Sequence, residues 1–195
     1  MIKGSETRKA DYPVDKIFLD RWSPRAMSGD HIDDIELFTL FEAARWAPSS
    51  SNEQPWRFVY AKKDTGHWDK MFNLLIDFNK IWCKNAAVLV CLTAKRTFSD
   101  SNGLNRNSLS DSGAAWENLA LQGSLKGLVV HGMAGYDVEK TRSELKISDD
   151  YEVVQMFAIG KPASKSILDE RMQKSEYPNA RKPTIEFVFE GVFGN

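Results

Sequence analysis

The sequence predicts an α+β protein in which helices cover both faces of a central sheet. Three apolar runs support this prediction, namely residues 86–93, 128–131 and 153–159. Each has the length of a strand, and each lacks the polar alternation of a strand with one solvated face. Helical patterns are well in excess of these strands, so a layered arrangement is expected.

The chain of 195 residues is expected to form one domain, because it contains no repeat, linker or low-complexity tract. Its formal net charge of -1 argues against binding to nucleic acid or to an anionic membrane. We expect a cytoplasmic location, since residues 1–16 lack the apolar core of a signal peptide and no run could span a bilayer.

Cysteines and histidines give no sign of a metal site. Cys83 and Cys91 lie in or near an apolar segment and form no CxxC pair, so we expect two reduced, buried thiols. His31, His67 and His131 lack the spacing of metal ligands.

In the first half of the chain, two helices and a strand are predicted. Asp30 can cap a helix that ends near Trp46, because Pro48 disfavours a helical residue before it. Residues 57–61 have the composition of a strand, and residues 67–78 are predicted to form a helix. Apolar residues of the first helix recur at spacings of three and four: Ile35, Leu37, Phe38, Leu40, Phe41 and Ala44.

In the second half, Ser110 and Asp111 can open a long helix that runs to residue 126 and ends at Gly127. A short helix is predicted over 138–145, and residues 184–189 form a late β-prone segment. The extension at about 163–195 has little amphipathic pattern before residue 184. We therefore expect it to wrap over another surface, such as a second subunit.

Two arginines flank a hydroxyl in the stretch RWSPR, residues 21–25. Guanidinium groups and a hydroxyl suit a phosphate. The alternative is an exposed basic loop in which Ser23 and Pro24 begin a helix.

Small polar residues fill the loop at 47–54, between the first helix and the first strand. So many hydrogen-bonding groups suit a polar ligand, and the alternative is a simple turn after a helix.

Two glycines follow a buried strand in HGMAGYD, residues 131–137, where a flat ligand could approach the backbone. This is not the GxGxxG dinucleotide motif, and a tight turn is the alternative.

By default, NARKP at 179–183 is a solvated basic turn. The sequence contains no GxSxG, P-loop or HExxH motif, and no carboxylate pair stands out as an acid and a base.

Together and in this order, these stretches resemble the FMN-dependent nitroreductase family. RWSPR resembles its N-terminal signature, and EAARWAPSSSNEQPWRFV resembles its more specific helix–loop–strand signature. AWENLALQGSLKGLVVHGMAGYD, IGKP and NARKP resemble later parts of the family pattern. The resemblance runs from about residue 17 to 190.

The resemblance implies a three-layer α/β/α fold with a central mixed sheet. It implies a single domain over 1–195 in a homodimer, with the extension at about 163–195 exchanged with the partner subunit. The implied FMN-binding residues are Arg21, Trp22, Ser23, Arg25, Pro48, Ser49, Ser50, Asn52, Met133, Ala134, Gly135 and Arg181.

The resemblance also implies a role for each group of these residues. Arg21, Ser23 and Arg181 would hold the phosphate, and Arg25 the pyrimidine edge of the flavin. The loop at 48–52 would line the flavin from the partner subunit, and the turn at 133–135 would pass beside the ring. Asn179 stands where some members have a lysine, and Ala134 where some have an acidic residue.

The implied reaction is hydride transfer from NAD(P)H to flavin N5, followed by ping-pong reduction of a nitroaromatic, a quinone or a similar small electron-poor acceptor. No catalytic side chain is implied, because the flavin carries the chemistry. One alternative is different flavin chemistry on the same scaffold, such as reductive dehalogenation or flavin breakdown. Those reactions need a lid, for which residues 95–110 are the candidate. Another alternative is a non-enzymatic FMN sensor.

Overall fold

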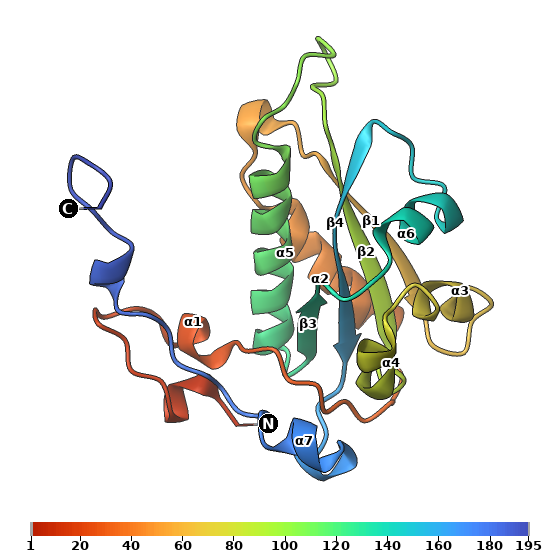
Figure 1. Cartoon of the computed structure of the whole chain (residues 1–195), viewed down its shortest axis with the longest axis vertical. Helices are drawn as coiled ribbons and strands as arrows, with labels where there is room; N and C mark the ends of the chain where they lie inside the picture. Colours follow the sequence, from red (N-terminus) through yellow and green to blue (C-terminus); the bar gives the residue numbers. More distant parts are fainter. Residues whose placement is uncertain (1, 195) are drawn as a thin grey trace.

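A four-stranded antiparallel sheet forms the centre of the computed structural model, which describes residues 2–194 (Figure 1). Its order is β1-β2-β4-β3, so β2 and β4 are central and β1 and β3 are edges. The strands are β1 (Trp56–Lys62), β2 (Val88–Lys95), β3 (Val129–Met133) and β4 (Tyr151–Gly160). Every strand pairing among the described residues is antiparallel. A mixed sheet also requires a parallel neighbour, which residues 2–194 do not supply within one chain.

Helices cover both faces of the sheet, which confirms the predicted α+β layers (Figure 1). On one face lie α2 (Asp34–Arg45) and α5 (Ser108–Leu125), and on the other lie α3 (Trp68–Phe72), α4 (Asp77–Cys83) and α6 (Val138–Glu144). Successive side chains of β2 enter different cores: Val88 and Val90 pack with the α2 and α5 residues, and Leu89 and Cys91 with the α3 and α4 residues. Two-sided burial explains why this strand is apolar throughout.

Two of the predicted helix limits differ in the structure, one because of a tertiary contact and one because of a local cap. The helix predicted over 67–78 is broken, because residue Leu75 bridges to Tyr136 and the N–H of Ile76 donates to Gly135 O at 3.1 Å. At the start of α2, the cap is Asp33, whose Oδ1 accepts from Glu36 N at 2.7 Å, and not Asp30. Residues 21–25, for which a helix start was the alternative, contain no helix.

The two ends of the chain run beside each other below the sheet. The N-terminal arm includes α1 (Lys16–Asp20), and the C-terminal segment includes α7 (Glu170–Gln173) (Figure 1). Beyond α7 the chain passes the N-terminal arm, where Thr184 N donates to Asp11 Oδ2 at 2.7 Å. The β-prone stretch at 184–189 begins as the 3₁₀ turn Thr184–Glu186 and not as a strand.

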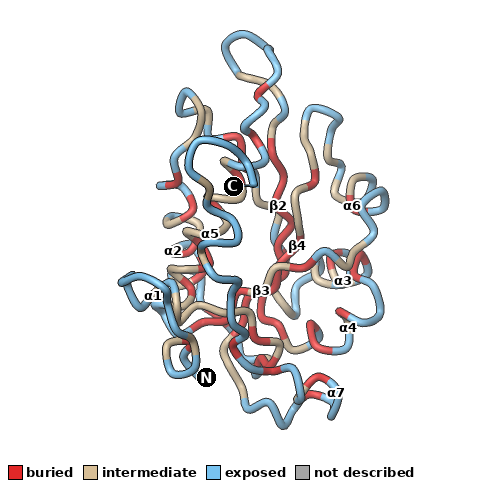
Figure 2. The backbone as a smooth tube through the Cα atoms, turned by 60° about the vertical axis from the view of Figure 1, so that its left-hand side comes forward, coloured by how far each residue is buried: buried red, intermediate tan, exposed pale blue. Residues whose placement is uncertain are grey.

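The last part of the tail is largely exposed (Figure 2). Its exposed apolar residues are Ile185, Phe187, Val188, Val192 and Phe193, the last of which is 95% exposed. These side chains bury little apolar surface in a single chain, although burial is what stabilises such residues.

Cys83 and Cys91 are free and fully buried, as predicted. Burial raises the pKa of the Cys91 thiol to about 12, so it stays protonated and unreactive. Within residues 2–194, no helix is long and apolar enough to cross a membrane, and no cluster of three metal-ligating side chains occurs.

Candidate functional site

Four arginines line one polar cavity of about 320 Å³ between the N-terminal arm, β3 and the tail. We call it the arginine cavity. Its lining residues are Arg8, Arg21, Trp22, Ser23, Arg25, His131, Ser175, Tyr177, Asn179 and Arg181. They come from both ends of the chain and from one edge strand, so the cavity exists only in the folded protein.

Helix α5 positions Arg21. The Nε atom of Arg21 lies 3.2 Å from Glu117 Oε1, and its guanidinium lies 5.9 Å from the ring centre of Trp116. Nη1 donates to Ser23 Oγ at 3.4 Å. Partial burial raises the pKa of Glu117, and the nearby Arg21 and Arg181 act in the opposite direction.

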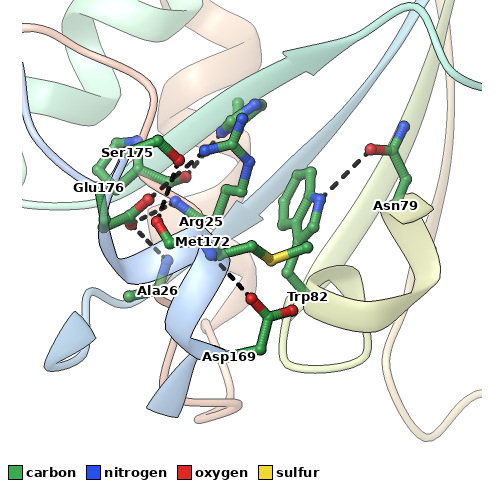
Figure 3. Close-up of polar contacts among 10 residues, drawn as sticks. Arg25, Ala26, Asn79, Trp82, Asp169, Met172, Ser175 and Glu176 are labelled. Carbon is green, nitrogen blue, oxygen red and sulfur yellow. Dashed lines mark hydrogen bonds and ion pairs between the residues drawn. The ribbon is translucent and has the colours of Figure 1, made fainter. Parts of the chain in front are cut away.

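A buried carboxylate fixes the backbone at Arg25 (Figure 3). Glu176 Oε1 accepts hydrogen bonds from the N–H groups of Arg25, at 2.6 Å, and Ala26, at 2.8 Å. Its Oε2 lies 3.8 Å from Arg25 Nη1. A buried carboxylate needs such partners, so Glu176 and the residue 25 backbone hold each other in place.

His131 packs between the arginine cavity and the core. Its ring centre lies 4.5 Å from that of Trp82, and its Nδ1 lies 2.8 Å from Pro24 O. A carbonyl oxygen only accepts, so Nδ1 carries the proton. The pKa of His131 is lowered to about 4, chiefly because burial disfavours the imidazolium and also because Arg25 and Arg21 repel it. The neutral ring therefore keeps Nε2 as an acceptor.

The turn after β3 leaves no room for side chains at Gly135. Gly135 O accepts from Asn79 Nδ2 at 2.9 Å, and a Cβ at this position would lie 2.6 Å from the same nitrogen. Met133 is buried, with its Sδ 3.4 Å from Cys83 Sγ, whereas Ala134 is exposed. The backbone and the small side chain of Ala134 are therefore what this turn offers to a ligand.

The loop at 47–54 lies elsewhere in the chain, at the N-terminal end of α5. Ser50 N donates to Asp111 Oδ2 at 3.0 Å, and Gln54 N donates to Ser49 Oγ at 3.0 Å. Ser51, Asn52 and Gln54 have positive φ values of 53°, 55° and 51°. Three such residues in one loop are costly, and strain of this kind is typical of functional sites.

A separate cavity of about 330 Å³ adjoins this loop. It is lined by Arg45, Trp46, Ala47, Asn52 and Gln54. It shares no lining residue with the arginine cavity.

Comparisons with known proteins identify the family. A model described as the nitroreductase family matches residues 19–81. A solved structure described as an oxidoreductase containing FMN is 41% identical, superimposes with a TM-score of 0.93, and covers 98% of both chains. The chain belongs to the nitroreductase family. Membership makes it an oxidoreductase and confirms the resemblance noted in the sequence.

More distant relatives are similar in structure or in sequence. A nitroreductase family protein from Streptococcus pneumoniae superimposes with a TM-score of 0.70 at 19% identity, covering 90% of this chain and 98% of that one. A Streptomyces coelicolor protein provisionally named NADH dehydrogenase/NAD(P)H nitroreductase is 23% identical over 84% of this chain and 90% of its own length.

In this nitroreductase chain, the residues implied by the resemblance fall into separate groups. Arg21, Trp22, Ser23, Arg25 and Arg181 line the arginine cavity together. Pro48, Ser49, Ser50 and Asn52 lie in the loop at the N-terminal end of α5. Met133, Ala134 and Gly135 end β3 and form the turn behind it.

Sequence reasoning missed several residues that line or support the cavity. Arg8 lies in an arm with no motif, so no pattern indicated its place beside residues 21 and 181. His131 is the first residue of HGMAGYD and lies in β3, but its sequence pattern did not indicate that its side chain lines the cavity. Nothing in the local sequence indicated that Glu176 is buried beneath Arg25.

Proposed function

We propose that the chain is a homodimeric, FMN-dependent oxidoreductase that takes a hydride from NAD(P)H and passes it to small electron-poor acceptors. The arginine cavity carries this proposal. Its four arginines have two carboxylate partners within residues 2–194, Glu117 and Glu176, which leaves an excess of two positive charges. A phosphate monoester carries about -1.5 to -2 charges at neutral pH, which matches this excess of positive charge.

Each group of residues has a proposed role toward FMN. Arg21, Ser23 and Arg181 hold the phosphate with charge-assisted hydrogen bonds. Arg25, held in place by Glu176, supplies a positive charge to the pyrimidine edge of the ring. The turn at 133–135 offers backbone groups to the ring. When bound, FMN supplies the hydride chemistry, and the protein supplies placement and charge.

The loop at 48–52 is proposed to complete the site of the partner subunit. Within one chain it lies away from the arginine cavity and shares no lining residue with it. A closed two-fold dimer can bring each loop to the other chain's cavity. The dimer would then have two identical sites, each formed by residues of both chains.

The tail is proposed to supply the dimer contact. Its exposed apolar side chains need burial, and both edge strands of the sheet have unpaired backbone groups. Residues 184–189 would add to the partner's sheet as a parallel strand, which makes the sheet mixed. The domain would then be the whole chain, with about 163–195 wrapped over the partner.

The nitroaromatic or quinone class of acceptor is favoured over chemistry that requires a lid. Between the end of β2 and the start of α5, the segment at 95–110 projects away from the sheet as a hairpin, with a bridge between Thr97 and Leu104 (Figure 1). Its Ser99 N donates to Glu53 Oε1 at 3.0 Å, so its polar groups serve the neighbouring loop. With no lid over the flavin, NAD(P)H and the electron acceptor would bind in turn at one open site, as a ping-pong mechanism requires.

The test is the visible spectrum of the purified protein, followed by anaerobic titration with NADH and with NADPH. We expect a bound flavin that one nicotinamide bleaches and that a quinone restores, with steady-state turnover. A flavin-free protein that binds no added FMN contradicts the proposal. A flavin that neither nicotinamide reduces points to the sensor alternative.

A further inference from the structure

The N-terminal arm inserts a guanidinium between the two chain segments that carry the proposed phosphate ligands. Arg8 Nε donates to Asn179 O at 2.8 Å, and Nη1 donates to Leu19 O at 2.8 Å and to Arg21 O at 2.7 Å. One side chain therefore joins the segment of Arg21 to the segment of Arg181. These three hydrogen bonds fix its position from three directions.

The charge of Arg8 is not neutralised by these contacts. Backbone carbonyls are dipoles, and no ion pair within residues 2–194 involves Arg8. Partial burial lowers the pKa of Arg8, and the positive charges of Arg181 and Arg21 lower it further. Three mutually repelling cations at one cavity are stabilised when an anion binds among them.

We propose that Arg8 is a further phosphate-binding residue of this nitroreductase. The inference rests on the proposed function and extends its cofactor site to the N-terminal arm. With Arg8, the cavity carries an excess of two positive charges; without it, the excess is one. Two charges match the phosphate monoester. Within the described residues, Nη2 of Arg8 forms none of the hydrogen bonds, so it remains a donor for the ligand.

The competing explanation is that Arg8 only clamps the two arms together. A clamp supports every ligand of the cavity equally, whereas a phosphate ligand acts on FMN and not on riboflavin, which lacks the phosphate. The ratio of the affinities for the two flavins therefore separates the explanations.

The experiment measures FMN and riboflavin binding to flavin-free protein by fluorescence quenching. The variants are Arg8→Gln, Arg8→Lys and the matched control Lys9→Gln, which removes an exposed charge next to Arg8 but outside the cavity. We expect Arg8→Gln to weaken FMN binding on the order of tenfold, as for a charge-assisted bond, and to leave riboflavin binding unchanged. Lys9→Gln should bind both flavins as the wild type does.

A second variant restores charge from the other side of the cavity. Asn179 lines the cavity and its carbonyl holds Arg8, so a lysine there places an ammonium among the same arginines. Arg8→Gln combined with Asn179→Lys should recover FMN affinity. Arg8→Lys should bind FMN better than Arg8→Gln does, because it keeps the charge. It should bind less well than the wild type, because an ammonium cannot reproduce the three-carbonyl contact.

Four outcomes overturn the inference. The first is equal FMN affinity of wild type and Arg8→Gln. The second is an equal loss for both flavins, which indicates a clamp. The third applies if Arg8→Gln fails to fold: Arg8→Lys then losing affinity equally for FMN and for riboflavin. The fourth is a wild type that binds neither flavin, which also contradicts the proposed function and so is distinguishable from the other three.

Discussion

The arginine cavity and the loop at 47–54 both carry proposed flavin ligands, but they are built differently. Contacts between distant parts of the chain build the cavity, such as Glu176 with Arg25 and Asn179 with Arg8. Local contacts and positive φ values shape the loop, which hydrogen bonds also join to Asp111 and Ser99. A cavity completed within the chain and a preformed loop lying apart from it suggest two halves of a site that meet only in a dimer.

Removing residues 184–195 tests this comparison with the largest expected effect. The deletion spares Glu176 and Arg181 but removes the exposed apolar side chains of the tail. We expect loss of the dimer and of bound FMN, while the sheet remains folded. Light scattering and the flavin absorbance report the two losses, and circular dichroism serves as the folding control. An FMN-loaded dimer from this variant would contradict the proposed role of the tail.

Arg21→Ala tests the arginine cavity, which is the half of the proposed site that lies within one chain. A hydrogen bond to a charged group contributes about 1.5–3 kcal/mol, so the dissociation constant for FMN should rise roughly 10- to 150-fold. The fold should be little changed. Arg171→Ala is the control, because it removes an exposed arginine outside the cavity. Equal FMN affinity of the two variants would remove Arg21 from the site.

Protonation of His131 should destabilise the part of the fold around the arginine cavity and leave the loop at 47–54 unaffected. Its pKa is lowered from 6.5 to about 4 in the folded protein, so the unfolded chain binds a proton more readily. Stability from this group is present above pH 6.5 and is lost as the pH falls toward 4. Between pH 7.5 and 5 the loss should be about 2 kcal/mol.

Chemical denaturation of wild type and His131→Gln at both pH values measures this loss. Glutamine can still donate to Pro24 O but does not titrate. The pH dependence should therefore be about 2 kcal/mol smaller in the variant. Identical pH profiles would mean that His131 is not the titrating group.

A mixed dimer of Arg21→Ala and Asn52→Asp tests the comparison directly, with an effect of a factor of two. Each homodimer should lose flavin from both sites. In the mixed dimer, one site combines both defects and the other combines two unaltered contacts, so about one FMN per dimer should bind. Co-expression with two tags isolates it for flavin quantification. Confirmed mixed dimers without flavin would show that the two residues do not act from different chains.

The sequence was most informative where local pattern and burial agree. The apolar run of β2 predicted a strand buried on both faces, and Gly127 marked the end of α5, where it has a φ of 72°. Prediction failed where a distant partner decides the structure. Leu75 pairs with Tyr136 and breaks a helical pattern, and Arg8 reaches the cavity from an arm without periodicity. Residues 184–189 have strand composition, but they find no strand partner within the described chain.

The contacts that close the arginine cavity also set an order of events during synthesis. Glu176 lies 151 residues after Arg25, and Asn179 lies 171 residues after Arg8. The sheet ends at Gly160, so all four strands leave the ribosome before these partners do. A nascent chain can therefore bury its core while the N-terminal arginines still lack the residues that hold them. Translation that stops before residue 176 would release a protein with an assembled sheet and without the contacts that close the arginine cavity.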